Sequence, residues 1–231
     1  ICFRARRSAR AGGGPAPREP RPAPAPAPTP AAGQTKISGP FRHENLVVFV
    51  IHGPDPLSGN KFLTLEEAMA RKKVVVHETG EVNELAIENV SSDEEVYIQS
   101  GDIVRGGRQD RVLAQDVIVP AKSGRLPLAS FCVESGRWTA RGGDAGRAFS
   151  TSENSVATKE LKLAAKKSGD QQQVWDQVAQ AQEKLSANLG GSVRAPESAS
   201  SLELTLENEK VKATVADYVK ELGRAIDGQP D

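Results

Sequence analysis

The residues whose types and spacing could support chemistry are concentrated between Tyr97 and Trp138. Gly106 and Gly107 lie there between two strand candidates, and such a pair favours a hairpin turn because glycine tolerates positive φ. The same unhindered amides, flanked by three arginines, could instead hold a phosphate, sulfate or carboxylate. Neither a Walker A loop nor a dinucleotide fingerprint is present. The candidate binding residues for a small anionic or sugar-like ligand are Arg105, Arg108, Gln109, Arg111, Glu134, Arg137 and Trp138.

Acidic side chains in the same stretch offer a second kind of chemistry. Asp102, Asp110, Asp116 and Glu134 could act as general acids and bases or hold a hard cation. Their even mixing with Arg and Gln is also typical of a hydrogen-bonded polar network. The catalytic candidates are Asp102, Asp110 and Glu134.

The run FCVESGRW, residues 131–138, is the most distinctive in the chain. In a strand, Phe131 and Val133 face one side and Cys132 faces the other. A catalytic thiolate needs a neighbouring base, and the sequence offers Cys132 no nearby histidine, so we interpret it as a small buried residue. Trp138 could stack on a ligand, or cover a sheet edge with Arg137 on its face.

Composition excludes several classes of function. The 231 residues carry a formal net charge of zero and only 4% aromatic residues, which removes the global argument for nucleic-acid binding. No apolar run is long enough for a membrane span. The two cysteines and three histidines lack the spacing of a disulfide framework or a metal site, and the sequence leaves the cofactor unknown. The first residue is Ile1, so we expect an incomplete N-terminus, and both cytoplasm and export remain open as locations.

The elements that must position these residues begin after a Pro/Ala-rich tail. Residues 1–36 cannot bury apolar area, and we expect a disordered spacer there. The apolar run 45–52 predicts a buried strand, and Thr64 predicts the N-cap of a short helix. Segments 74–78 and 84–89 are further strand candidates.

Helical periodicity replaces the strand pattern after a glycine-rich stretch. Ser155 predicts the cap of a helix over about 156–168, and Asp170 that of a helix over 171–188. A third helix is expected from about Leu204 to Ile226, with its apolar stripe packed on a core.

Strands followed by helices indicate an α+β fold and exclude alternating βαβ units. We expect a mostly antiparallel sheet or sandwich over 41–138, followed by about three packed helices over 155–227. Together they would form a single domain, 41–231.

The segments GGRQDR (106–111), FCVESGRW (131–138) and QQQVWDQVA (171–179) resemble the ARG-and-rhodanese-phosphatase-superfamily-associated domain family, which is uncharacterised and mainly bacterial. The similarity extends over about 41–231. It implies no settled activity, cofactor or substrate. The positions that match the family pattern are Glu81, Asn83, Gly101, Gly106, Gly107, Gln109, Asp110, Arg111, Asp116, Glu134, Gly136, Arg137, Trp138 and Trp175.

Two departures from the family pattern accompany this resemblance. At Asp102 the family more often has glutamate, whose longer reach would serve catalysis better. Family members also tend to continue into a short strand and helix, so we expect a chain truncated at both ends. A missing element could expose an apolar patch.

Three hypotheses follow, and whether the protein is an enzyme stays open. The first is a non-enzymatic ligand-binding or protein-interaction module with a polar pocket around 102–138. The second is a hydrolase acting on a phosphate- or ADP-ribose-type substrate. In the third, the polar residues are a structural network around one tight turn. A concave pocket that joins the 102–111 loop to residues 134–138 and holds a carboxyl of raised pKa would favour the enzyme. Such a pocket without that carboxyl would favour binding, and a flat surface would favour the structural network.

Overall fold

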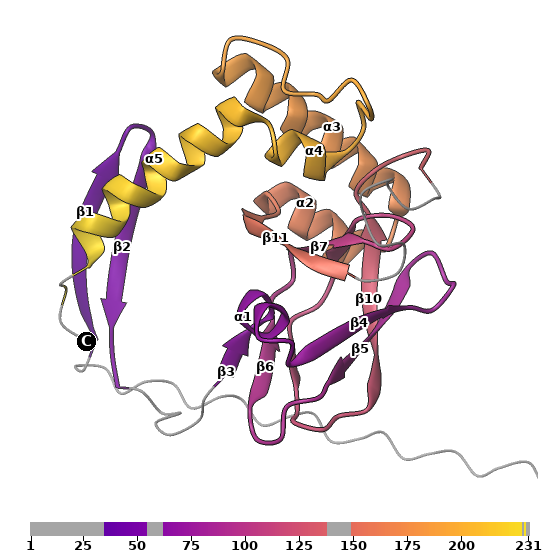
Figure 1. Cartoon of the computed structure of the whole chain (residues 1–231). Coiled ribbons are helices and arrows are strands. Elements are labelled where there is room, and N and C mark those ends of the chain that lie inside the picture. The colour runs from indigo at the N-terminus through magenta and orange to yellow at the C-terminus, as the bar shows by residue number, and fades with distance from the viewer. Residues whose placement is uncertain (1–34, 55–61, 138–148, 228, 230–231) are drawn as a thin grey trace, which may run out of the picture.

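The computed structural model describes residues 35–54, 62–137, 149–227 and 229 (Figure 1). Most of the Pro/Ala-rich tail and Trp138 therefore lie outside the described residues. The predicted order of strands followed by helices is confirmed, and the described sheets are mostly antiparallel. Strand β1 already begins at Lys36, which was predicted as the last residue of the tail.

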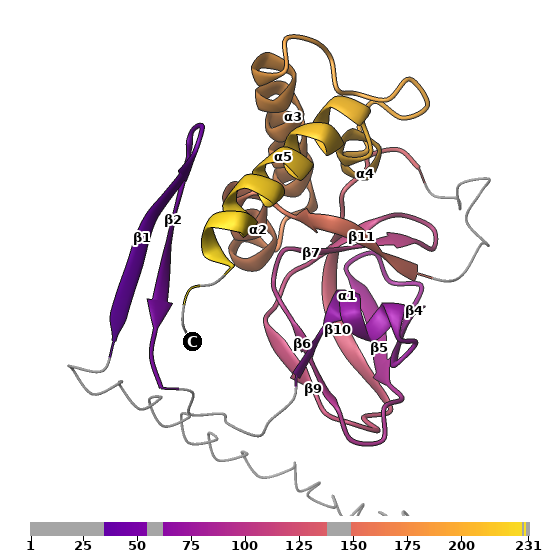
Figure 2. The same ribbon diagram turned by 60° about the vertical axis from the view of Figure 1, so that its left-hand side comes forward.

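An antiparallel hairpin opens the described chain and lies beside the last helix (Figures 1 and 2). Its strands are β1 (Lys36–His43) and β2 (Leu46–His52). The prediction of a buried strand here was half wrong. Val48 and Val50 are half-buried, whereas Phe49 and Ile51 are 55% and 69% exposed, because a helix covers only one face of the hairpin.

Two sheets curl around one apolar core to form a small barrel-like body. The larger has the order β11-β7-β8-β10-β5-β4, and the smaller has the order β3-β6-β9. The larger sheet consists of β4 (Val74–Glu78), β5 (Glu84–Asn89), β7 (Asp102–Gly106), β8 (Arg111–Leu113), β10 (Arg125–Cys132) and β11 (Phe149–Val156). The smaller consists of β3 (Phe62–Thr64), β6 (Glu95–Ile98) and β9 (Val117–Val119).

Helix α1 (Leu65–Ala70) begins at the predicted cap. Thr64 accepts a hydrogen bond from the Glu67 amide, and the Glu67 carboxylate accepts one from the Thr64 amide, which completes a capping box. Leu65 and Ala68 are buried in the barrel core, so this short helix is fixed at its start and along one face.

The helical half differs from the prediction at two boundaries. Residues 149–156 form β11, so the first helix starts later than expected: α2 (Lys159–Leu163) is capped by Thr158 and continues into a π-helical turn, η1 (Ala164–Ser168). Helix α3 (Gln171–Asn188), capped by Asp170, matches its prediction.

The third predicted helix is two helices, α4 (Leu202–Leu206) and α5 (Glu209–Ile226). Asn208 separates them because its side chain accepts a hydrogen bond from the Lys210 amide at 3.0 Å and starts a new helix.

A second apolar cluster joins the sheet to the helices. Ile103 of β7 and Val112 of β8 pack there, while their neighbours Val104 and Leu113 face the barrel core. These strands are therefore buried on both faces. The helices contribute Leu161, Ala165, Val174, Val178 and Leu202.

Candidate functional site

The Gly-Gly motif forms the predicted turn between β7 and β8. Gly107 has φ +56° and lies against two other strands. A Cβ there would be 2.3 Å from Glu78 Oε1 and 2.5 Å from Phe149 Cζ. The Glu78 carboxylate accepts a hydrogen bond from the Arg108 amide at 2.7 Å. The turn is thus held against the ends of β4 and β11, which are the two edges of the larger sheet.

The residues that follow the glycines are buried and bonded to one another. Gln109 and Asp110 are 0% exposed and Arg111 is 2% exposed. Asp110 accepts a hydrogen bond from the Gly106 amide at 2.9 Å. The Arg111 guanidinium donates to the carbonyl and to the side-chain oxygen of Gln109, both at 3.2 Å.

Glu134 and Arg137 complete this group. Arg137 Nε donates to Glu134 Oε2 at 2.6 Å, and its Nη2 lies 3.5 Å from Asp110 Oδ2. Its Nη1 donates to the Arg108 carbonyl at 3.1 Å, and the Gln109 amide donates to the Arg137 carbonyl. We call Gln109, Asp110, Arg111, Glu134 and Arg137 the turn cluster.

Cys132 is fully buried and lies opposite Arg111 in the ladder between β8 and β10. Burial raises the pKa of its thiol, although the positive charge of Arg111 acts in the opposite direction. The side-chain amide of Gln171 accepts from the Cys132 amide at 2.9 Å and donates to its carbonyl at 2.8 Å. The full burial of Cys132 agrees with its interpretation as a small buried residue.

Asp102 and Asp116 lie at the other end of β7 and bind backbone amides. Asp102 accepts from the Gln99 amide and Asp116 from the Ser100 amide, each at 2.9 Å. Burial raises the pKa of Asp102, whereas a hydrogen bond from Lys166 lowers the pKa of Asp116. Asp102 is about 13 Å of extended strand from the Gly-Gly turn, so it does not join Asp110 and Glu134.

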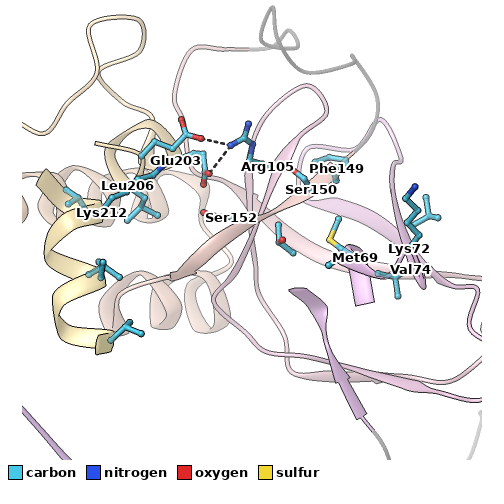
Figure 3. A pocket seen from close by; sticks show the side chains of 18 of the residues that line it. Met69, Lys72, Val74, Arg105, Phe149, Ser150, Ser152, Glu203, Leu206 and Lys212 are labelled. Atoms are coloured by element: carbon cyan, nitrogen blue, oxygen red, sulfur yellow. Dashed lines mark hydrogen bonds and ion pairs between the residues drawn. The ribbon is translucent and has the colours of Figure 1, made fainter. Parts of the chain in front are cut away.

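The three arginines of the predicted anion site do not converge. Arg111 is buried in the turn cluster, Arg108 is exposed, and Arg105 extends toward α4. There Arg105 forms an ion pair with Glu207 and lies 3.8 Å from Glu203 (Figure 3).

Beside Arg105 lies an open groove with a volume of about 1220 Å³ (Figure 3). β11 and Arg105 form its floor, α1 and β4 line one side, and α4 and α5 line the other. Its apolar surface includes Met69, Val74, Val75, Phe149, Leu206, Val211, Val215 and Val219, and its basic residues include Lys72, Lys212 and Lys220.

Sequence reasoning missed this groove because it placed the whole apolar stripe of α5 on a core. Val211 is buried, but Val215 and Val219 are 38% and 61% exposed. The stripe itself was a signal of an apolar face, but periodicity does not show whether such a face is covered.

Glu203 is the buried acidic residue of the groove wall, with 2% of its surface exposed. Burial raises the pKa of its carboxyl, while a hydrogen bond from Ser152 and the charge of Arg105 lower it in part. Its Oε2 has no hydrogen-bond partner among the described residues.

The chain thus has a barrel-like sheet body with appended helices, a buried turn cluster and a separate groove. The family model described as ARG and Rhodanese-Phosphatase-superfamily-associated Protein domain matches residues 34–230. The chain belongs to this family, as its motifs suggested. Neither the curated proteins nor the solved structures give a significant match.

Two absences apply to the part of the chain that the structure describes. None of its helices is long and apolar enough to cross a membrane. None of its His, Cys, Asp and Glu side chains gather in threes as potential metal ligands.

Proposed function

We propose that this protein is a non-enzymatic interaction module that binds a partner in the groove between its barrel-like body and α5. The observation that carries the proposal is the groove itself, where the apolar side chains of Val215 and Val219 are left in water. Exposed apolar patches of this kind mark binding surfaces in soluble proteins.

The turn cluster supports this choice by having little capacity left for a ligand. Its carboxylates and guanidiniums bond to one another or to backbone groups, and four of its five members are almost fully buried. Of the described residues that the sequence singled out for ligand binding, Arg105 alone lines the groove. The turn cluster fixes the β7–β8 hairpin from which Arg105 extends.

A hydrolase acting on a phosphate- or ADP-ribose-type substrate is the second candidate. One observation favours it: Glu203, a carboxyl with a raised pKa, lies beside the Arg105 guanidinium at the groove wall. A general acid next to a group that can pair with phosphate would fit such chemistry. Turnover of a phosphate or ADP-ribosyl substrate that is lost in Glu203→Gln would select this function.

Binding of the dye anilinonaphthalene sulfonate, an apolar anion, tests whether the groove is a binding surface. We expect Val219→Asp to reduce the fluorescence enhancement at least about twofold, because the groove wall becomes charged. Phe49→Asp is the matched control, since Phe49 is 55% exposed on the hairpin and does not line the groove. If the dye fluorescence were lost in Phe49→Asp but unchanged in Val219→Asp, the groove would be excluded as the binding surface for the dye.

A further inference from the structure

The exposed face of α5 has the spacing of a helix-packing ridge. Val211, Val215 and Val219 are four residues apart, so their side chains form one row along the helix. Val211 is buried at one end of the row, and exposure rises to 38% and then 61% toward the other end. Rows of this kind pack into the matching rows of another helix.

The size of the groove also fits a helix. A helix of about 10 Å diameter fills roughly 120 Å³ per residue, so a volume of about 1220 Å³ holds about ten residues, or nearly three turns. Typical small-molecule pockets are smaller, at about 300–1,000 Å³, and more enclosed.

The charge at the groove indicates the chemistry of that helix. Lys72 lies on the side of α1 and β4, and Lys212 and Lys220 lie on α5, about 12 Å apart along the helix. Among the described residues, neither Lys72 nor Lys212 makes an ion pair, whereas Lys220 Nζ lies 3.6 Å from Glu221 Oε1. The acids of the groove, Glu203 and Glu207, both face Arg105. The groove therefore presents an excess of positive charge, which a partner with acidic flanks would match.

A second copy of the chain matches this charge poorly. The hairpin is another exposed apolar element, but it carries Lys36 and Arg42 against one acid, Glu44. The matching face of a second α5 would bring its own Lys212 and Lys220 toward these lysines. Like charges placed together would weaken either arrangement.

We propose that the groove receives an amphipathic helix with acidic flanks from a partner protein. This inference rests on the proposed function and names the partner's chemistry. The apolar face of the incoming helix packs on the valine row of α5, and its carboxylates face the lysines on both sides. This is the helix-in-groove mode of recognition.

The test uses labelled peptides of about 14 residues, and the first two are locked as helices by side-chain lactams. The first has Leu at helical spacing and Glu elsewhere, and the second replaces Glu by Lys. The third is left unlocked and keeps the Glu/Leu composition with Leu at every second position. Fluorescence polarisation with the full chain is expected to show binding of the Glu helix, and at least about tenfold weaker binding of the other two. Lys212→Glu combined with Lys220→Glu should reverse the charge preference. Lys210→Glu, on α5 but outside the groove lining, should leave it unchanged.

The outcomes separate this inference from the proposed function. Suppose that dye binding depends on the groove but all three peptides bind equally, or the alternating peptide binds more tightly. That result would overturn the proposal of a helical partner and leave the groove as a binding surface. Loss of all groove-dependent binding, in peptides and dye alike, would overturn both. Light scattering that shows a dimer in the wild type and a monomer in Val219→Asp would assign the groove to a second copy and also overturn the inference.

Discussion

Gly107 is the residue at which the β7–β8 turn and the two sheet edges approach most closely. Gly107→Ala would place a Cβ within 2.5 Å of Glu78 and Phe149 at a positive φ. We expect a loss of about 2–4 kcal/mol in the free energy of unfolding, from backbone strain and overpacking together. Urea denaturation measures it.

Gly124→Ala is the matched control, because Gly124 has a similar φ of +63° and a Cβ added there would meet no atom within 4 Å. It should lose only the strain contribution, about 1 kcal/mol. Equal losses in the two variants would contradict the close packing of the turn.

Arg137 neutralises two buried carboxylates of the turn cluster. Arg137→Met would leave Glu134 and Asp110 without this partner, and we expect the free energy of unfolding to fall by about 3 kcal/mol. Arg108→Met, at an exposed position in the same turn, should change it by less than about 0.5 kcal/mol. Similar urea midpoints for the two variants would mean that the cluster contributes little to stability.

The buried carboxyl of Glu203 makes the free energy of unfolding depend on pH. Burial raises the pKa of its carboxyl in the folded state above 4.5, so the folded chain binds more protons than the unfolded chain over the range between the two pKa values. This contribution to the free energy of unfolding is present at low pH and decreases as pH rises through that range. Glu203→Gln lacks this titration.

The stability of Glu203→Gln relative to the wild type should therefore increase between about pH 4 and pH 7. Urea denaturation at several pH values measures the difference. Glu207→Gln removes the other carboxylate that faces Arg105 and controls for the loss of an ion pair. A relative stability that stays constant or falls with pH would contradict the burial of the Glu203 carboxyl.

At the residue scale, the sequence grouped four acids, and the structure brings only Asp110 and Glu134 of them together in the turn cluster. Gly-Gly predicted the turn, and the mixture of acids with Arg and Gln indicated a network. The sequence did not predict that the guanidiniums of Arg105 and Arg111 would lie in different places. Alternation along an extended segment places Arg105 and Arg111 on the same side. The turn between them separates the two guanidiniums, because Arg105 pairs with Glu207 beside α4 and Arg111 bonds to Gln109.

At the scale of elements, Asn208 is the boundary that divides the C-terminal helical pattern. Asn208→Ala removes the hydrogen bond to the Lys210 amide, and we expect a loss of about 1 kcal/mol in the free energy of unfolding. Thr214→Ala, within α5, is the control because its hydroxyl donates to a helical carbonyl and caps nothing. Thermal denaturation followed by circular dichroism compares them, and equal losses would argue against the cap.

Element types were more predictable than element ends. Asp170 and Thr64 gave correct helix starts because a capping side chain is a local signal. Strand β11 was missed, since 149–152 is polar apart from Phe149 and pairs with β7, far away in sequence. Such pairing leaves little trace in local composition.

At the scale of the whole molecule, the apolar surfaces that remain in water include the groove and the outer face of the β1–β2 hairpin. On the hairpin, Ile37 pairs with Ile51, and both are more than 60% exposed, while Phe49 extends the same face. The sequence indicated that these segments were apolar. Which face each would leave uncovered depends on how α5 lies between the hairpin and the barrel-like body (Figure 2).

The attachment of the hairpin has a consequence for how the molecule opens. No described hairpin residue belongs to either buried apolar cluster, and its side-chain contacts with α5 include Tyr218 to Asn45 and His43 to Asp217. Few buried contacts mean a low free energy of local unfolding. Amide hydrogens of β2 should therefore exchange with deuterium well before those of β5, whose neighbours on both sides are paired strands. Mass spectrometry of exchanged peptides would detect the hairpin as a separate cooperative unit, and equal protection of β2 and β5 would show that the chain opens only as a whole.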